Sequence, residues 1–83
     1  MIKVKLYGHI RGLIGEELKL DREELRVKEL LEIVVRSGGH GFQLNHENTL
    51  VAVNGVEVSA LDGWDTIVRS GDEVSLIPVT HGG

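Results

Sequence analysis

Cysteine is absent from the 83-residue chain, and this absence removes several kinds of chemistry at once. Without cysteine there is no disulfide framework, no thiol nucleophile and no thiolate ligand for a metal. Domains below about 100 residues rarely divide further, so we expect one domain with one core. A chain this short buries only about 60% of its unfolded surface, which argues against a spacious internal active site. The lack of cysteine suits the cytoplasm, which is the location we predict.

Long apolar runs and basic stripes are also missing. The residues from Met1 to Leu6 alternate polar and apolar side chains, whereas a secretory signal needs an unbroken apolar stretch of about 7 to 15 residues. No segment approaches the length of a transmembrane helix. The formal net charge of −4 is spread over both ends of the sequence, which predicts solubility and repulsion from nucleic acid. We therefore expect neither a nucleic acid nor a membrane as a partner.

The first half of the chain predicts a hairpin followed by a helix. Ile2 to Tyr7 alternates with a period of two residues, which is typical of a strand with one buried face. Leu18 to Leu20 predicts a short second strand, and the glycines between Gly8 and Gly15 predict a long turn. From Val27 to Ser37 apolar residues recur at i, i+3, i+4 and i+7, which predicts a helix. Arg26 stands where a capping residue is expected, so the start of this helix is weakly marked.

A second hairpin is predicted after a loop. The stretch from Gly38 to Asn48 is polar and rich in glycine, which is typical of a loop. Leu50 to Val53 and Val56 to Val58 then flank Asn54-Gly55. Both turn residues accept the positive φ of a type I′ turn, so this is the strongest hairpin signal in the chain.

The last part of the domain predicts an irregular stretch and a final strand. Ala60 to Arg69 shows no clear period. We expect three of its residues to anchor it in the core, namely Leu61, Trp64 and Ile67. Glu73 to Val79 predicts the last strand, with Val74 and Leu76 facing inward.

This order of elements predicts an α+β fold, with one main helix packed on one face of a mixed sheet of about five strands. The order β-β-α-β-β-β is that of the β-grasp fold of ubiquitin. In this fold the first and last strands are neighbours and run parallel, a pairing that needs a long crossover such as the one containing the helix. We place the domain at residues 1–79 and a flexible tail at residues 80–83.

The tail has features that packing does not explain. Two consecutive glycines, Gly82 and Gly83, add no buried area and lose the most entropy when ordered. They suit a carboxylate that must be threaded into the narrow active site of another protein, because no Cβ lies near the reacting carbon. The carboxylate is a poor electrophile, so acyl transfer requires activation by a partner. The alternative is a frayed chain end without a role.

The sequence resembles the ubiquitin-like sulfur carriers, which include the small subunit of molybdopterin synthase (MoaD) and the carrier of the thiamine pathway (ThiS). The likeness spans nearly the whole chain. The blocks that carry it are, in chain order, Met1-Ile2-Lys3-Val4, Arg11 with Leu13-Ile14-Gly15, Val27-Lys28-Glu29-Leu30-Leu31, Val53-Asn54-Gly55, Gly71-Asp72-Glu73-Val74 and Gly82-Gly83.

The resemblance implies a carrier that serves enzymes and is not an enzyme alone. In the family an E1-like adenylyltransferase uses ATP to adenylate the terminal carboxylate, and a sulfur donor enzyme converts it to a thiocarboxylate. By this likeness Gly83 would be adenylated and thiolated, with Gly82 as its neighbour in the channel. Molybdopterin synthesis, with the large subunit of molybdopterin synthase as a partner, is the pathway we expect first.

Two alternatives remain open from the sequence. Trp64, upstream of Ile67-Val68, is closer to the thiamine carrier than to the molybdopterin subunit, so the thiamine pathway is the runner-up. Conjugation of Gly83 to lysines of target proteins uses the same activated tail. The tail itself departs from the family pattern, because His81 stands where a small residue is usual.

A docking surface for the partner enzymes is predicted beside the tail. Alternation directs Tyr7 and Ile77 away from the helix, and the parallel pairing places both at the same end of the sheet. Exposed apolar patches commonly mark partner sites, although scattered surface hydrophobes are also normal. We expect Val79, Thr80 and His81 to contact the partner as well.

We predict neither a metal site nor a bound cofactor. The spacing of the histidines matches no helical pair or finger motif; they are His9, His40, His46 and His81. The glycines from Gly38 to Gly41 lack the Lys-Ser/Thr of a phosphate-binding loop. The carboxylates Glu16-Glu17 and Glu23-Glu24 are typical of solvated turns, so no catalytic constellation is predicted.

Overall fold

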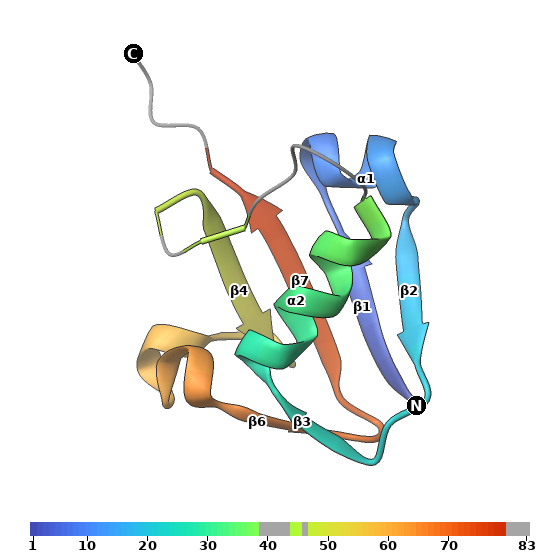
Figure 1. The fold of residues 1–83 in the computed structure, drawn as a ribbon. Coiled ribbons are helices and arrows are strands. Elements are labelled where there is room, and N and C mark those ends of the chain that lie inside the picture. The colour runs from blue at the N-terminus through green and yellow to red at the C-terminus, as the bar shows by residue number, and fades with distance from the viewer. Residues whose placement is uncertain (39–43, 46, 80–83) are drawn as a thin grey trace.

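The computed structural model describes residues 1–38, 44–45 and 47–79. Helix α2 crosses one face of a five-stranded sheet with the strand order β2-β1-β7-β4-β5, and β3 pairs with β6 in a separate two-stranded sheet (Figure 1). The elements are β1 (Ile2–Leu6), α1 (Gly8–Ile14), β2 (Glu17–Leu20), β3 (Glu24–Arg26), α2 (Val27–Gly38), β4 (Thr49–Val53), β5 (Val56–Glu57), the 3₁₀ helices η1 (Val58–Ala60) and η2 (Gly63–Asp65), β6 (Ile67–Arg69) and β7 (Glu73–Pro78). This is the ubiquitin-like α+β arrangement that the sequence predicts.

The centre of the sheet is formed by the first and the last strand. β1 and β7 run parallel, with Val4 opposite Val74 and Leu6 opposite Leu76. β7 also pairs antiparallel with β4 on its other side. The prediction of adjacent, parallel terminal strands is therefore confirmed, and the carboxyl end of β7 lies between two neighbouring strands.

Helix α2 supplies one wall of the core. The four apolar residues expected on one face of the helix are all buried: Val27, Leu30, Leu31 and Val34. Arg26 precedes the helix, and its backbone N–H donates to Oε1 of Glu29 at 3.1 Å. A glutamate at the third helical position commonly satisfies the cap residue in this way. The start of the helix is thus fixed by a residue inside its first turn.

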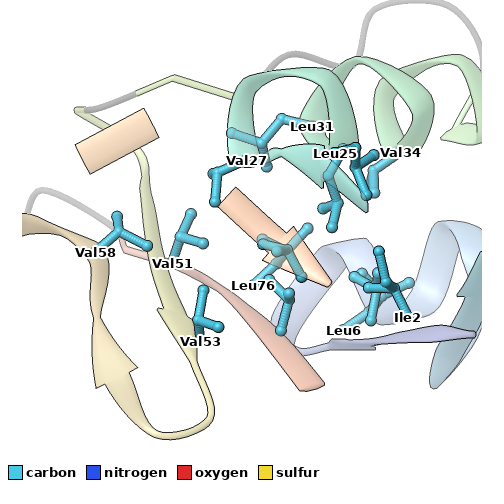
Figure 2. Packing of buried hydrophobic residues seen from close by; sticks show 14 of the residues in the cluster. Ile2, Leu6, Leu25, Val27, Leu31, Val34, Val51, Val53, Val58 and Leu76 are labelled. Carbon is cyan, nitrogen blue, oxygen red and sulfur yellow. The ribbon is translucent and has the colours of Figure 1, made fainter. Parts of the chain in front are cut away.

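Apolar side chains from both layers meet in a single cluster. Figure 2 shows Val27, Leu31 and Val34 of α2 above Val51 and Leu76 of the sheet. Val74 and Leu76 are fully buried, as predicted from the alternation in the last strand. At about 25 cal/mol per Å² of apolar area, burial of such side chains is the main favourable contribution to folding.

The segment between the first two strands differs from the prediction. A long turn was expected over residues 8–15, but Gly8–Ile14 forms helix α1. Ile10 is fully buried and attaches this helix to the core, whereas Leu13 is 57% exposed. Three glycines lower the helix propensity of the segment, so the helix depends on the tertiary contact of Ile10.

The prediction of three core residues after the second hairpin is partly wrong. Leu61 and Ile67 are exposed at 46% and 40%, while Val68 is fully buried and Trp64 packs against the core only in part. For Ile67 and Val68 the reason is the pairing of β6 with β3, in which Val68 lies opposite Leu25. Both of these residues face the core, so their neighbours along each strand face outward.

The Asn54-Gly55 turn is confirmed. Asn54 and Gly55 have φ values of 50° and 84°, as a type I′ turn requires. Oδ1 of Asn54 accepts from the backbone N–H of Glu73 at 3.0 Å, and Nδ2 donates to Oδ1 of Asp72 at 3.0 Å. The turn is therefore bonded to the start of β7. β5 is shorter than predicted, because Val58 begins η1.

Candidate functional site

The candidate site lies at the carboxyl end of β7, on the face of the sheet opposite α2. Ile77 pairs with Leu50 of β4, and the parallel register of β1 and β7 brings Tyr7 beside Ile77. Tyr7, Leu50 and Ile77 are exposed at 41%, 36% and 37%. We call these three residues the outer patch. It exposes two aliphatic side chains and one aromatic ring where the chain leaves the sheet.

Charged residues adjoin the outer patch along the same strands. Nζ of Lys5 lies 3.4 Å from Oε1 of Glu73, which lies two residues before Ser75, the partner of Lys5 in the register of β1 and β7. The hydrogen bond and the negative charge of Glu73 raise the pKa of the Lys5 ammonium above its ordinary value. An apolar centre with a polar rim is the usual anatomy of a protein interface.

Pro78 and Val79 form the base of the tail. Pro78 is held on the side of β1. Gly8 is the first residue of α1 and has a φ of +61°, and a Cβ placed there would lie 3.1 Å from Cγ of Pro78. Only glycine adopts this backbone conformation without cost while allowing so close an approach. Pro78 is the last residue of β7. The ring of Pro78 therefore packs directly against the backbone at the start of α1.

The base is held from the side of β4 by a hydrogen bond. The backbone N–H of Val79 donates to the carbonyl oxygen of Asn48 at 2.9 Å. Thr49, which follows Asn48, is buried and lies opposite Pro78 in the sheet register. Val79 itself is 38% exposed. The chain thus leaves the domain from a point fixed by both neighbouring strands.

Comparison with known protein families matches residues 4–83 of this chain to the ThiS family. The chain belongs to the ThiS family. The sequence resemblance to ubiquitin-like sulfur carriers is thereby confirmed, and a chain of this family is a small carrier rather than a catalyst.

Relatives of this ThiS-family chain agree with the assignment. A protein of Archaeoglobus fulgidus assigned as a sulfur carrier is 35% identical over 89 positions, which cover 99% of this chain and 98% of that protein. A solved structure of a molybdopterin converting factor, subunit 1, from Pyrococcus furiosus is 28% identical with a TM-score of 0.67, covering 95% of this chain and 97% of that one.

The fold is also shared with a more distant archaeal protein. The solution structure of small archaeal modifier protein 1 from Methanosarcina acetivorans has a TM-score of 0.77 and 23% identity, and the match covers 99% of this chain and 95% of that one. At this identity the likeness supports the ubiquitin-like fold of the ThiS-family chain.

The structure places only some of the predicted site residues. Tyr7 and Ile77 lie on one face and at one end of the sheet, as expected, and Val79 lies at the base of the tail. The remaining predicted site residues lie outside the described residues; they are Thr80, His81, Gly82 and Gly83. Their roles stay predictions.

Leu50 is a member of the outer patch that the sequence analysis missed. It was placed in a strand, but its direction was not considered. Val51 and Val53 are buried, so the period of two residues in β4 sends Leu50 to the opposite face. The same alternation that identified Tyr7 and Ile77 contained this signal.

The described surface also has a groove on the side of α2. This groove of about 430 Å³ follows α2, and its lining combines apolar and charged side chains, among them Leu31, Val35, Arg36 and Trp64.

Over residues 1–38, 44–45 and 47–79, no group of three or more His, Asp or Glu residues could hold a metal ion. His9 lies on α1, and the other three histidines fall outside this range. In the same range no helix is long and apolar enough to cross a membrane.

Proposed function

We propose that this ThiS-family chain carries sulfur for molybdopterin synthesis, as a thiocarboxylate on Gly83. The observation that carries the proposal is the outer patch at the carboxyl end of β7, because it places an exposed apolar surface at the point where the tail leaves the domain. Such a patch allows an enzyme to bind the domain while the tail enters its active site.

The chemistry of the proposed cycle uses partners for every bond-forming step. A carboxylate oxygen of Gly83 attacks the α-phosphorus of ATP, and pyrophosphate leaves. Sulfide, or a donor at the same oxidation level, then attacks the activated carbonyl, and AMP leaves with the bonding electron pair. The product is a thiocarboxylate, which a second enzyme uses to place sulfur on a pterin precursor. In this scheme Gly82 keeps the channel narrow, because it brings no side chain.

The proposed partners bind the same part of the molecule. An E1-like adenylyltransferase, a sulfur donor enzyme and the large subunit of molybdopterin synthase would each contact the outer patch and the residues that follow it. Tyr7 and Ile77 would supply the apolar contact, while Val79, Thr80 and His81 would line the entrance of the channel. Aromatic and apolar side chains at the centre of an interface commonly contribute most of its affinity.

The molybdopterin pathway is favoured by the P. furiosus molybdopterin converting factor, which aligns over most of both chains. The family assignment also favours a second candidate, because the ThiS family takes its name from the carrier of the thiamine pathway. The two pathways differ in the sulfur acceptor, which the carrier itself does not contain.

Intact mass spectrometry of the chain from its source cell tests the carrier function. We expect a species whose mass corresponds to exchange of one oxygen for one sulfur, and we expect it to disappear when the E1-like enzyme is deleted. Deletion of Gly83 should abolish it. A terminus that stays unchanged in every condition would overturn the proposal.

Deletion of the gene separates the pathways. Loss of molybdopterin without a requirement for thiamine supports the first proposal, and a thiamine requirement with normal molybdopterin supports the second. Lysine-linked conjugates that form in place of a sulfur-bearing species would instead indicate a protein modifier.

A further inference from the structure

The five-stranded sheet ends on one side at β2. In the described part of the chain, β1 is the one strand that pairs with β2, and Figure 1 shows β2 at the border of the sheet, beyond β1. The opposite edge strand, β5, has two residues, Val56–Glu57, whereas β2 has four, Glu17–Leu20. β2 is therefore the longer of the two edges at which another strand could be added.

The backbone hydrogen bonds of β1 alternate between its two neighbours. The N–H of Lys3 donates to the carbonyl oxygen of Asp72, on the side of β7, at 3.1 Å. The N–H of Leu6 donates to the carbonyl oxygen of Glu16, on the side of β2, at 2.9 Å. Odd-numbered residues of β1 thus bond toward β7, and even-numbered residues bond toward β2.

The same alternation leaves the backbone groups of Glu17 and Lys19 on the open side of β2. Leu18 lies opposite Val4 in the antiparallel register, and Val4 is an even-numbered residue that bonds toward β2. Glu17 and Lys19 flank this bonded pair, so the N–H and C=O of both residues point away from β1. The edge therefore offers two donors and two acceptors to an added strand.

The charges around Lys19 are unbalanced. Lys19 lies opposite Lys3 of β1 in the sheet register, and like charges directly opposite each other destabilise a sheet. The carboxylate nearest to Lys19 is that of Glu17 in its own strand, with 3.9 Å between Nζ of Lys19 and Oε2 of Glu17. A carboxylate brought to Lys19 from the open side would offset the repulsion from Lys3.

The two faces of the edge have different characters. Leu18 is partly buried and packs against the core on the side of α2, so Glu17 and Lys19 lie on the opposite face. A lysine at a sheet edge often prevents pairing with other chains. On β2 a glutamate stands two residues from the lysine on the same face, so an antiparallel copy of this edge is complementary to the first.

We propose that β2 is a self-association edge, at which a second copy of this chain adds its own β2 in the antiparallel direction. In the register that fits, Leu18 lies opposite Leu18 of the second copy. Glu17 then lies opposite Lys19 of the second copy, and Lys19 lies opposite Glu17 of the second copy. Each of these two pairs exchanges two backbone hydrogen bonds and joins opposite charges.

Other registers match the edge less well. A shift by two residues places Glu17 opposite Glu17, or Lys19 opposite Lys19, and the like charges repel. A shift by one residue places the open backbone groups of Glu17 opposite Leu18, whose own groups already bond to β1. Charge and hydrogen bonding therefore favour the same register.

The resulting dimer has a two-fold axis and one continuous sheet of ten strands, five from each copy. Because the two β2 strands are antiparallel, the carboxyl ends of the two β7 strands lie at opposite ends of this sheet. The outer patch has no residue in β2, so it stays on the surface of each copy. The inference is therefore independent of the proposed function.

Sedimentation equilibrium of the full chain tests the association. Four backbone hydrogen bonds and two ion pairs make a small interface, so the dimer is weak and the measurement extends to about 1 mM protein. We expect a monomer–dimer equilibrium whose Kd rises several-fold between about 20 mM and about 500 mM NaCl, because salt screens the two ion pairs. A monomer at every concentration would overturn the inference.

Charge reversal locates the interface. Lys19→Glu and Glu17→Lys should each raise the dimer Kd at least about tenfold, because both symmetric pairs then join like charges. A mixture of the two variants should associate with a Kd within about threefold of the native value, since every pair between them joins opposite charges again. Misfolded variants could not regain association in this way.

Lys28→Glu is the matched control, because it changes the net charge as Lys19→Glu does but lies on α2. Its Kd should stay within about twofold of the native value. A native dimer that survives both single reversals would place the contact elsewhere and overturn the inference. A mixture that stays monomeric would contradict the register of β2 with β2 and overturn it as well.

Discussion

At the scale of single residues, Gly8 has little room for a side chain. Its φ of +61° lies in the left-handed region, and a Cβ there would lie 3.1 Å from Cγ and 3.3 Å from Cδ of Pro78, which is closer than an ordinary contact. Gly8→Ala should therefore lower the free energy of unfolding by about 1–2 kcal/mol. Urea denaturation followed by circular dichroism measures this change.

Gly12→Ala is the matched control for Gly8→Ala. Gly12 lies in the same helix, and a Cβ there would meet nothing within 4 Å. Because alanine has the higher helix propensity, this variant should be neutral or more stable by up to about 1 kcal/mol. Equal destabilisation by both variants would contradict the contact between Gly8 and Pro78.

Glu57 gives a pH-dependent prediction at the same scale. Its carboxylate accepts the backbone N–H of Ser59 at the start of η1, and this bond holds the pKa of Glu57 below its ordinary value. A carboxyl whose pKa is lowered by folding stabilises the native state above its unfolded pKa. This stabilisation is lost as the pH falls through the folded pKa.

Glu57→Gln should therefore flatten the acid side of the stability curve. The native chain loses stability as the pH falls through the folded pKa of Glu57, because the carboxylate is then protonated. The glutamine has no proton to gain. Urea denaturation at a series of pH values below neutrality measures the difference between the two proteins. Parallel curves for both proteins would show that the bond to Ser59 does not favour the ionised form.

At the scale of elements, α2 begins with a bond made by its own first turn. Glu29→Ala removes the acceptor of the Arg26 N–H, so we expect a loss of about 0.5–1 kcal/mol in the free energy of unfolding. Glu29→Gln keeps an oxygen at the same position and should retain most of the stability. If glutamine were as damaging as alanine, the charge rather than the hydrogen bond would explain the effect.

Elements whose apolar residues recur at a regular spacing were predictable from sequence, and elements that depend on tertiary contacts were not. Val27, Leu30, Leu31 and Val34 repeat over two turns, so α2 was predicted to within one residue at its end. α1 contains two glycines and one buried residue, Ile10, and no local pattern compensates for its low propensity. β3 and β6 have three residues each, which is too few to show alternation.

At the scale of the whole molecule, the outer patch can be tested with a matched pair of isoleucines. Ile77 and Ile67 are both in strands and are exposed at 37% and 40%. Only Ile77 adjoins the tail. Ile77→Glu should raise the KM for the carrier in ATP–pyrophosphate exchange about tenfold, since it places a charge at the centre of the proposed interface.

Ile67→Glu should leave that KM close to the native value. Both substitutions lie on the surface, so each should change the free energy of unfolding by no more than about 0.5–1 kcal/mol. A similar rise in KM for both variants would indicate a general loss of structure, and no rise for Ile77→Glu would remove the patch from the docking surface.

The candidate site was predictable where it depends on alternation and on the parallel strands, which is why Tyr7 and Ile77 were found. The contacts that fix Pro78 and Val79 at the end of β7 were not predictable. They need Gly8 to contact Pro78 and Asn48 to bond Val79, and each pair is separated by many residues in the sequence. Only the assembled sheet brings these partners together.

The central place of β7 makes folding depend on synthesis of the chain through Pro78. Until Glu73–Pro78 has been translated, β1 and β4 have no strand between them, and the core lacks Val74 and Leu76. The pairing of β1 with β7 joins the two ends of the domain, and contacts of such long range form late. A chain interrupted before β7 lacks Ile77 of the outer patch together with the tail, so an activating enzyme that requires both would use ATP only on chains that extend through β7 and the tail.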